Sequence, residues 1–331
     1  MDSEPLNKPL ATVEGELMRR RPYRVVVYDH GIYSLLILAI VIASLTVQDF
    51  ATGGNVKALL VSVSIEGLVA IGMTFVVISG SWVDLSVPST VALGSIITLT
   101  LEPQGPVVAV GGALGAALAI GLVNGIVVSR GGNPVLTTLA LFTIVTGINS
   151  GLNGASAVYA RPGWLARMVD GSTGPVPNLV ILFVFTAVVG QFVLRQSRFG
   201  FEVYTTGANR IAARVSGVPV RRVLVAVFVV SALLAGLAGV MAGSYGGEAD
   251  LNVGAGYDFF ALTAVVVGGT SLFGGRGDVS KTVAGLLFIG LITNVMLLLN
   301  LSVDLQPVVL GGMIIVMVGL DAMFVRRAIN L

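Results

Sequence analysis

The sequence contains no cysteine and a single histidine, His30. Without cysteine the chain has no disulfide bonds, no thiolate nucleophile and no cysteine-ligated metal. One histidine cannot build the multi-histidine sites that hold zinc in proteins. We therefore expect no metal site and no cofactor bound by this chain.

Charged residues are also scarce. They make up 11% of the 331 residues, while 55% are hydrophobic. Soluble domains carry about a quarter of charged residues, so this chain could not cover a water-facing surface of its size. Its 43 glycines are typical of helices that approach one another closely in lipid. The composition predicts a protein whose main solvent is a membrane.

Long apolar runs predict the transmembrane segments. A span needs about 20 mostly apolar residues, and lipid admits only helices or closed barrels. We expect an all-α, polytopic bundle of about ten helices, with a polar tail over residues 1–30 and one transmembrane domain over 31–331. The expected helices are 31–47, 56–79, 86–101, 106–129, 134–152, 178–194, 223–244, 257–270, 281–299 and 306–325. The third and eighth are short enough to be tilted, broken or partly re-entrant.

The basic residues are concentrated in alternate loops. If the N-terminus is inside, the inside loops hold Arg130, six arginines of segment 195–222, Arg276 and Lys281, and both inside termini carry arginines. This positive-inside bias predicts that both termini are cytoplasmic. The tail is too long and too polar for the start of a signal peptide, and we expect it to be retained.

Segment 195–222 is the longest inside loop. Its sequence "TTGANRIAARVSGVPVRR" predicts a short helix over 209–216, with Asn209 at its start and with Gly217 and Pro219 at its end. Small residues on such a helix leave room for the groove of another protein. The alternative interpretation is a simple positive-inside anchor.

These residues also carry a family resemblance. "TTGANRIAARVSGVPVRRV" and the apolar run after it resemble the cytoplasmic coupling segment of ribose-type ABC sugar importer permeases, in the branched-chain/ribose permease superfamily. "VAIGMTFVVISGSWVDLSVPSTVALGS", "NPVLTTLALFTIVTGI" and "VVVGGTSLFGGRGDVSKTVAGLLFIGLITNVMLLLNLS" resemble further stretches of that family, in the same order. The matches run from about residue 55 to 325, and Trp82, Val83 and Pro88 depart from the family pattern.

The resemblance implies the partners. An ABC ATPase would dock on the cytoplasmic face and hydrolyse ATP, and a periplasmic or lipid-anchored solute-binding protein would deliver the solute. The permease would pair with a second copy of itself or a paralogous permease in the bacterial inner membrane. No nucleic-acid partner is implied. The residues that would couple to the ATPase are Gly207, Asn209, Ala212, Ala213, Arg214 and Gly217. The chain has no G-x-x-x-x-G-K-[ST] phosphate loop, which agrees with a transport subunit that is not itself an enzyme.

Asp84 lies between two long apolar runs and has two compatible interpretations. Asp84 or Ser86 could accept hydrogen bonds at the start of the next helix, with Pro88 in its first turn. Alternatively, the break between the helices could line the translocation path or its cytoplasmic gate. A similar unit with Asp278 and Ser280 suggests an internal repeat.

Other polar residues inside apolar runs are candidates for the same path. Glu66 is the acidic residue well inside a span and should face the interior of the bundle or a cavity. Its structural alternative is a hydrogen bond to a neighbouring helix. Thr74, Asn124 and Asn294 are open to the same two interpretations.

The sequence favours a permease that moves a monosaccharide or related polyol by alternating access. The scarcity of charge inside the spans suits a neutral, hydrated solute. A permease for a nucleoside or another non-sugar solute remains an alternative. An ion-coupled secondary transporter would need more ionisable groups in the spans than Glu66 and Asp84. A membrane-embedded enzyme would need a motif such as H-E-x-x-H, which the sequence lacks.

Overall fold

The helices follow the apolar segments closely. The computed structural model describes residues 22–153, 156–161, 163–165, 171–302 and 304–329. The helices in the predicted segments are α2 (Pro22–Thr46), α3 (Gly53–Ile78), α4 (Val87–Leu101), α5 (Pro106–Ser129), α6 (Pro134–Asn153), α8 (Asn178–Gln196), α11 (Val220–Gly246), α12 (Tyr257–Val267), α13 (Val279–Leu298) and α14 (Leu305–Ile329). The described part also contains the 3-10 helix η1 (Glu102–Gln104), α9 (Arg198–Ala208) and α10 (Arg210–Val215). Every segment predicted as a helix therefore contains one.

Some helices are long enough to cross a membrane and others are too short. In the described part of the chain, six helices are long and apolar enough to cross a membrane, namely α3, α5, α6, α8, α11 and α13. Helices α4 and α12, with 15 and 11 residues, are shorter, as predicted for the third and eighth segments. The described part of α2 extends from Pro22 and so includes residues of the segment predicted as a tail. Residues 1–21 lie outside the described part.

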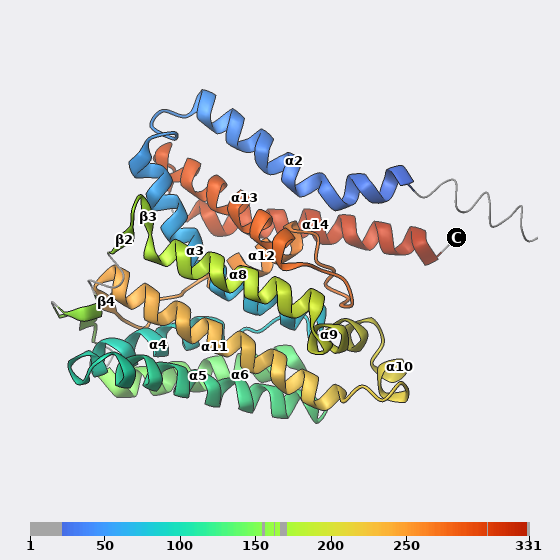
Figure 1. The fold of residues 1–331 in the computed structure, drawn as a ribbon, viewed down its shortest axis with the longest axis horizontal. Coiled ribbons are helices and arrows are strands. Elements are labelled where there is room, and N and C mark those ends of the chain that lie inside the picture. Colours follow the sequence, from blue (N-terminus) through green and yellow to red (C-terminus); the bar gives the residue numbers. More distant parts are fainter. Residues whose placement is uncertain (1–21, 154–155, 162, 166–170, 303, 330–331) are drawn as a thin grey trace, which may run out of the picture.

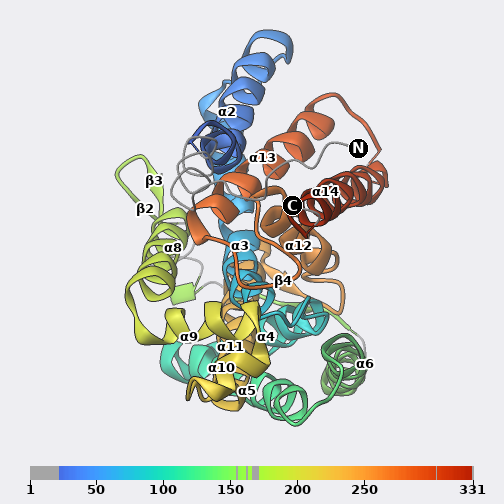
Figure 2. The same cartoon turned by 90° about the vertical axis from the view of Figure 1, so that its right-hand side faces the viewer.

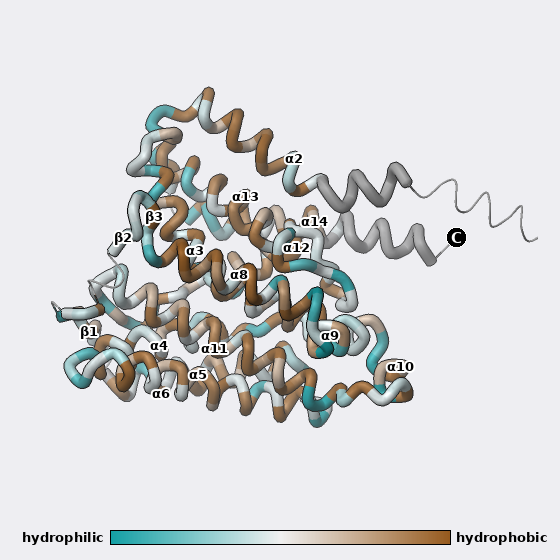
Figure 3. Tube along the Cα trace, viewed as in Figure 1, coloured by the Kyte–Doolittle hydropathy of each residue, from teal (hydrophilic) through white to brown (hydrophobic). Residues whose placement is uncertain are grey.

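Helix α3 forms the centre of the bundle (Figures 1 and 2), where α8, α11, α12 and α13 surround it. Its apolar window is 89% buried, whereas that of α6 is only 22% buried. The apolar residues of α8, such as Phe185 and Phe192, point outward, as expected for side chains that face lipid. Figure 3 shows hydrophobic residues along the long helices and hydrophilic residues at their ends.

Glycines allow α11 to pack directly on α4 and α5. A Cβ atom at Gly125 of α5 would lie 2.6 Å from the Cα atom of Val225, and one at Gly94 of α4 would lie 2.7 Å from the carbonyl oxygen of Gly236. Both distances are too short for a real Cβ atom. Small residues therefore set the spacing of these helices, as in other membrane bundles.

The two ends of the bundle differ. Helices α9 and α10 lie at one end, and the Pro22 end of α2 and the Ile329 end of α14 lie on the same side (Figure 1). At the opposite end, strand β1 (Val158–Tyr159) pairs with β4 (Glu248–Ala249), and β2 (Ser172–Thr173) pairs with β3 (Val176–Pro177). The sequence did not predict these short strands or the separate helix α9.

Candidate functional site

The candidate site lies at the end of the bundle that carries α10. Asn209 is the N-cap of α10, and its side-chain oxygen accepts hydrogen bonds of 3.0 Å from the backbone N–H groups of Ile211 and Ala212. An N-cap of this kind satisfies donors that a helix start leaves free. The predicted helix and its predicted cap are both confirmed.

The end of α10 is a Schellman motif. Gly217 has φ +81°, and its N–H donates to the Arg214 carbonyl while the N–H of Val218 donates to the Ala213 carbonyl. Ala213 is buried against Val218, Val220 and Leu224 of the following segment. Glycine suits this left-handed position because it has no Cβ atom to clash. The motif fixes the direction in which the chain enters α11.

The outer face of α10 is open. Ala212 and Arg214 are exposed, and the side chains of Ile211 and Val215 are 75% and 85% exposed. Ile211 and Val215 are four residues apart and therefore share one face of the helix. Two large aliphatic side chains held out on a capped, charged helix form a surface that can bind another protein.

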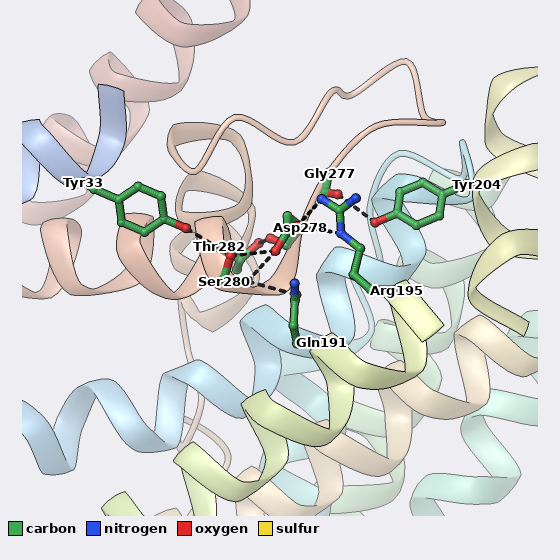
Figure 4. Close-up of polar contacts among 8 residues, drawn as sticks. All are labelled: Tyr33, Gln191, Arg195, Tyr204, Gly277, Asp278, Ser280 and Thr282. Carbon is green, nitrogen blue, oxygen red and sulfur yellow. Dashed lines mark hydrogen bonds and ion pairs between the residues drawn. The ribbon is translucent and has the colours of Figure 1, made fainter. Parts of the chain in front are cut away.

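A second group of residues ties the loop before α13 to α8 and α9 (Figure 4). The Arg195 guanidinium of α8 forms an ion pair with Asp278, in which Nε donates to Oδ2 at 2.8 Å. Asp278 caps α13 by accepting from the backbone N–H and the hydroxyl of Ser280. The Tyr204 hydroxyl of α9 donates to the Gly277 carbonyl oxygen at 2.8 Å.

Asp278 is ionised despite its burial. Burial by itself raises the pKa of this carboxyl, but hydrogen bonds from Ser280 and Arg195 outweigh that effect and hold the pKa below its ordinary value. The network extends to α2, because the Tyr33 and Ser280 hydroxyl oxygens lie 3.0 Å apart. The Gln191 side-chain oxygen also accepts from the Ser280 N–H at 3.3 Å. Neither Arg195 nor Tyr204 was predicted, because their partners are distant in sequence.

A third, fully buried group surrounds Asp84. Asp84 Oδ1 accepts from the Ser86 N–H at 3.0 Å and from its hydroxyl at 2.6 Å, and Oδ2 accepts from the Ser231 hydroxyl at 3.0 Å. The Asn124 amide donates to the Ser86 hydroxyl oxygen at 2.8 Å. Asp84 thus binds Ser86, the N-cap residue that precedes α4. The helix-start interpretation predicted that Asp84 or Ser86 would accept from a first-turn N–H group of α4, but in the described structure neither side chain does. Ser231 escaped sequence analysis because α11 carries no local motif around it.

The remaining predicted path residues lie apart from this group. The Thr74 hydroxyl donates to the Ala70 carbonyl and lies 2.9 Å from the Thr282 hydroxyl oxygen. Asn294 exchanges hydrogen bonds of 2.8 and 2.9 Å with Asn55 of α3. Glu66 is half-buried on α3, and the described part of the chain gives its carboxylate no hydrogen bond. The structure brings Asp84, Ser86 and Asn124 together but not Glu66, Thr74 or Asn294.

Comparison with known proteins now places the chain in a family. Residues 55–318 match the family described as "Branched-chain amino acid transport system / permease component". The chain belongs to this permease family. The match begins near the start of α3 and ends within α14. It therefore includes α10, the break between α3 and α4, and the break between α12 and α13.

Curated relatives extend the match to nearly the whole chain. The D-allose transport system permease protein AlsC of Escherichia coli is 32% identical, over 93% of this chain and 97% of its own length. The L-arabinose ABC transporter permease protein AraH of Azospirillum brasilense is 34% identical, over 88% and 86%. The ribose import permease protein RbsC of Bacillus subtilis is 35% identical, over 86% and 90%. These relatives confirm the resemblance to ribose-type permeases. No solved structure matches the chain.

Proposed function

We propose that this chain is the membrane-spanning subunit of an ABC importer that moves a monosaccharide, such as an allose-, arabinose- or ribose-like sugar, by alternating access. The observation that carries this proposal is the near full-length similarity to permeases named for three different monosaccharides. A partner ATPase binds and hydrolyses ATP, and this chain binds no cofactor of its own. A solute-binding protein delivers the sugar on the opposite side of the membrane.

The ATPase docks on α10. Ile211 and Val215 supply the apolar part of the contact, and Arg214, Arg221 and Arg222 surround it with positive charge. Burying one large aliphatic side chain stabilises a complex by about 1.5–3 kcal/mol. The cap of Asn209 and the turn at Gly217 keep this helix in a fixed orientation, so that movement of the partner displaces α10 as a unit.

The topology follows from this docking. The end with α9 and α10 is cytoplasmic, both termini are on that side, and about ten helices cross or enter the bilayer. Helices α4 and α12 are too short to cross it alone. The permease works as a pair, either with a second copy or with a paralogue, in the bacterial inner membrane.

The solute is neutral in this proposal. The buried polar groups along α3 to α5 are mostly hydroxyls and amides, which suit the hydroxyl groups of a sugar. A nucleoside offers similar hydrogen-bonding groups and is the alternative solute. Because the two solutes offer similar groups, the solute bound by the accompanying binding protein decides between them.

Purification of the tagged chain from the membranes of its own host in mild detergent tests the proposal. Mass spectrometry should find an ABC ATPase and a solute-binding protein in the eluate. A partnerless protein that moves solute in liposomes without ATP would contradict the proposal and favour a secondary transporter.

Variants of α10 test the docking surface. Val215→Glu places a charge on the exposed apolar face, and we expect at least a ten-fold loss of co-purified ATPase, or about 1.4 kcal/mol. Tyr159→Glu is the matched control, because Tyr159 is 67% exposed on β1 at the opposite end. The control should retain the ATPase. Equal ATPase recovery with Val215→Glu would rule out the α10 surface.

A further inference from the structure

Three backbone segments touch where α9 ends. They are the end of α3 with Ile78 and Gly80, residue Gly207 of α9, and the loop before α13 with Gly274 and Gly275. The Gly275 N–H donates a 2.8 Å hydrogen bond to the Ile78 carbonyl oxygen. We name this contact the glycine junction, after Gly80, Gly207, Gly274 and Gly275.

The glycine junction has no room for side chains. A Cβ atom at Gly207 would overlap the Ile78 carbonyl oxygen and lie 2.6 Å from the Gly275 nitrogen. One at Gly274 would lie 2.8 Å from the Gly80 Cα atom. Gly80, Gly274 and Gly275 also have positive φ angles of 72°, 83° and 73°, which glycine adopts without strain. Backbone therefore packs on backbone here, with no side chain between to absorb a displacement.

Arg210 joins this junction to α10. Arg210 is the first residue of α10, and its Nη2 donates to the Gly80 carbonyl oxygen at 3.0 Å and to the Ser81 hydroxyl at 3.3 Å. Partial burial and the nearby charge of Arg214 lower the pKa of Arg210, as expected for a guanidinium taken partly out of water. A cation at the C-terminal end of α3 is favourable because helix dipoles place partial negative charge there.

The junction sits beside both helix breaks. Ser81 is three residues before Asp84, which binds Ser86, the N-cap of α4. Gly275 is three residues before Asp278, the N-cap of α13. A displacement of α10 therefore reaches the α3–α4 break through Arg210. It reaches the α12–α13 break through Gly207, whose neighbour in space is Gly275.

We propose that Arg210 is a positioning residue that links the ATPase-docking helix α10 to both helix breaks through the glycine junction. The inference rests on the proposed function, because it assumes that a partner displaces α10. Movement of α10 pulls on the carbonyl end of α3 and shifts the starts of α4 and α13 together. Arg210 faces inward to Gly80, unlike Ile211 and Val215, and so transmits movement without forming the docking surface.

The test separates transmission from docking. Arg210→Ala removes both hydrogen bonds, and Arg210→Lys keeps the charge but loses the fork-shaped guanidinium. With the complex in liposomes, Arg210→Ala should retain ATPase co-purification and basal ATP hydrolysis. It should lose binding-protein-stimulated hydrolysis and sugar uptake by about ten-fold or more, because the guanidinium contacts with Gly80 and Ser81 that connect α10 to the end of α3 are gone. Arg210→Lys should restore part of both activities.

Arg130→Ala is the matched control. Arg130 follows α5 at the same end of the bundle, is exposed, and its side chain has no recorded hydrogen bond in the described structure. This variant should keep wild-type stimulation and uptake.

Distinct outcomes overturn the inference. Wild-type uptake by Arg210→Ala would show that the contact transmits nothing. Loss of ATPase binding by Arg210→Ala would show that Arg210 is a docking residue. An equal loss of stimulation and uptake in Arg130→Ala would show that removing any positive charge at this end causes the defect. If no ATPase co-purifies with the wild-type chain, the proposed function itself is wrong.

Discussion

Asp84 and Asp278 make the same pair of hydrogen bonds at two different breaks between helices. Each carboxylate accepts from the backbone N–H and the hydroxyl of the serine two residues later, Ser86 in one case and Ser280 in the other. In each case a helix ends before the break, α3 before Asp84 and α12 before Asp278. This shared geometry supports the internal repeat suggested by the sequence.

The second oxygen of each carboxylate distinguishes the two breaks. Asp84 Oδ2 accepts from the neutral Ser231 hydroxyl, whereas Asp278 Oδ2 binds the Arg195 guanidinium. Asp84 is fully buried among helices, and Asp278 lies beside the partly exposed Arg195. One break is therefore held by neutral partners and the other by an ion pair.

Replacing Asp84 should destabilise the protein more than replacing its partner Ser231. Asp84→Ala leaves the buried Ser86 and Ser231 hydroxyls and the Ser86 N–H without their acceptor, and each such group costs about 1–3 kcal/mol. Ser231→Ala removes one donor, so its cost should be about 1 kcal/mol. Thermal unfolding in detergent measures the difference. Equal melting temperatures for the two variants would contradict the network.

The Asp278 ion pair should make stability depend on acid pH. The folded pKa of Asp278 is lowered, so its contribution is complete above the unfolded value of about 3.9 and is lost as the pH falls through the folded value. Asp278→Asn should therefore be less stable than the parent chain at pH 7, by about 1–3 kcal/mol. This difference in stability between the parent chain and Asp278→Asn should become smaller as the pH falls toward about 3.

Melting curves at several pH values check this sign. Asp304→Asn is the control for removal of an acidic charge, because Asp304 is exposed and bonded only to nearby Ser302 in the described part of the chain. A gap between the parent chain and Asp278→Asn that widens in acid would contradict the assignment.

Removing the cap of α10 should loosen this helix alone. Asn209→Ala loses two hydrogen bonds to the first turn and should cost about 1 kcal/mol, while Asn209→Asp keeps an acceptor. Hydrogen exchange should speed up about five-fold over residues 210–217 in the alanine variant, because 1 kcal/mol corresponds to that factor. Unchanged exchange there would mean that packing of Ala213, rather than the cap, holds α10.

Glu66→Gln should leave the protein folded and transport-competent. The Glu66 carboxylate makes no hydrogen bond in the described structure, so an amide of nearly the same shape removes no bonded partner and should not destabilise the protein, because an unpaired, half-buried carboxylate is itself costly. Uptake assays with and without a proton gradient measure the outcome. Proton-dependent uptake that disappears in Glu66→Gln would favour a secondary transporter instead.

Sequence patterns predicted the elements well but the contacts between them poorly. Apolar runs located the long helices because each span must satisfy its own backbone, and Asn209 and Gly217 marked α10 because capping depends on local chemistry. The partners Ser231 and Arg195 lie 147 and 83 residues from the aspartates that they bind. No local pattern encodes such pairs, since tertiary packing brings them together.

The glycines show the same limit. Their abundance predicted close helix packing in general. No sequence pattern distinguished Gly207, which touches two other segments, from Gly115, which has open space around it. The polar residues of the spans were likewise treated as one candidate path. Burial and pairing divide them into the Asp84 group, the Thr74–Thr282 contact and the Asn55–Asn294 pair.

Helix α11 connects the two ends of the bundle without a break. It begins at Val220, directly after the turn that closes α10, and ends at Gly246, directly before strand β4, which pairs with β1 at the opposite end. One continuous helix of 27 residues therefore has α10 at its N-terminal end and the β1–β4 ribbon at its C-terminal end. A displacement at either end of α11 would tilt the whole helix, so the α10 end and the β-ribbon end of the bundle are connected by one continuous element.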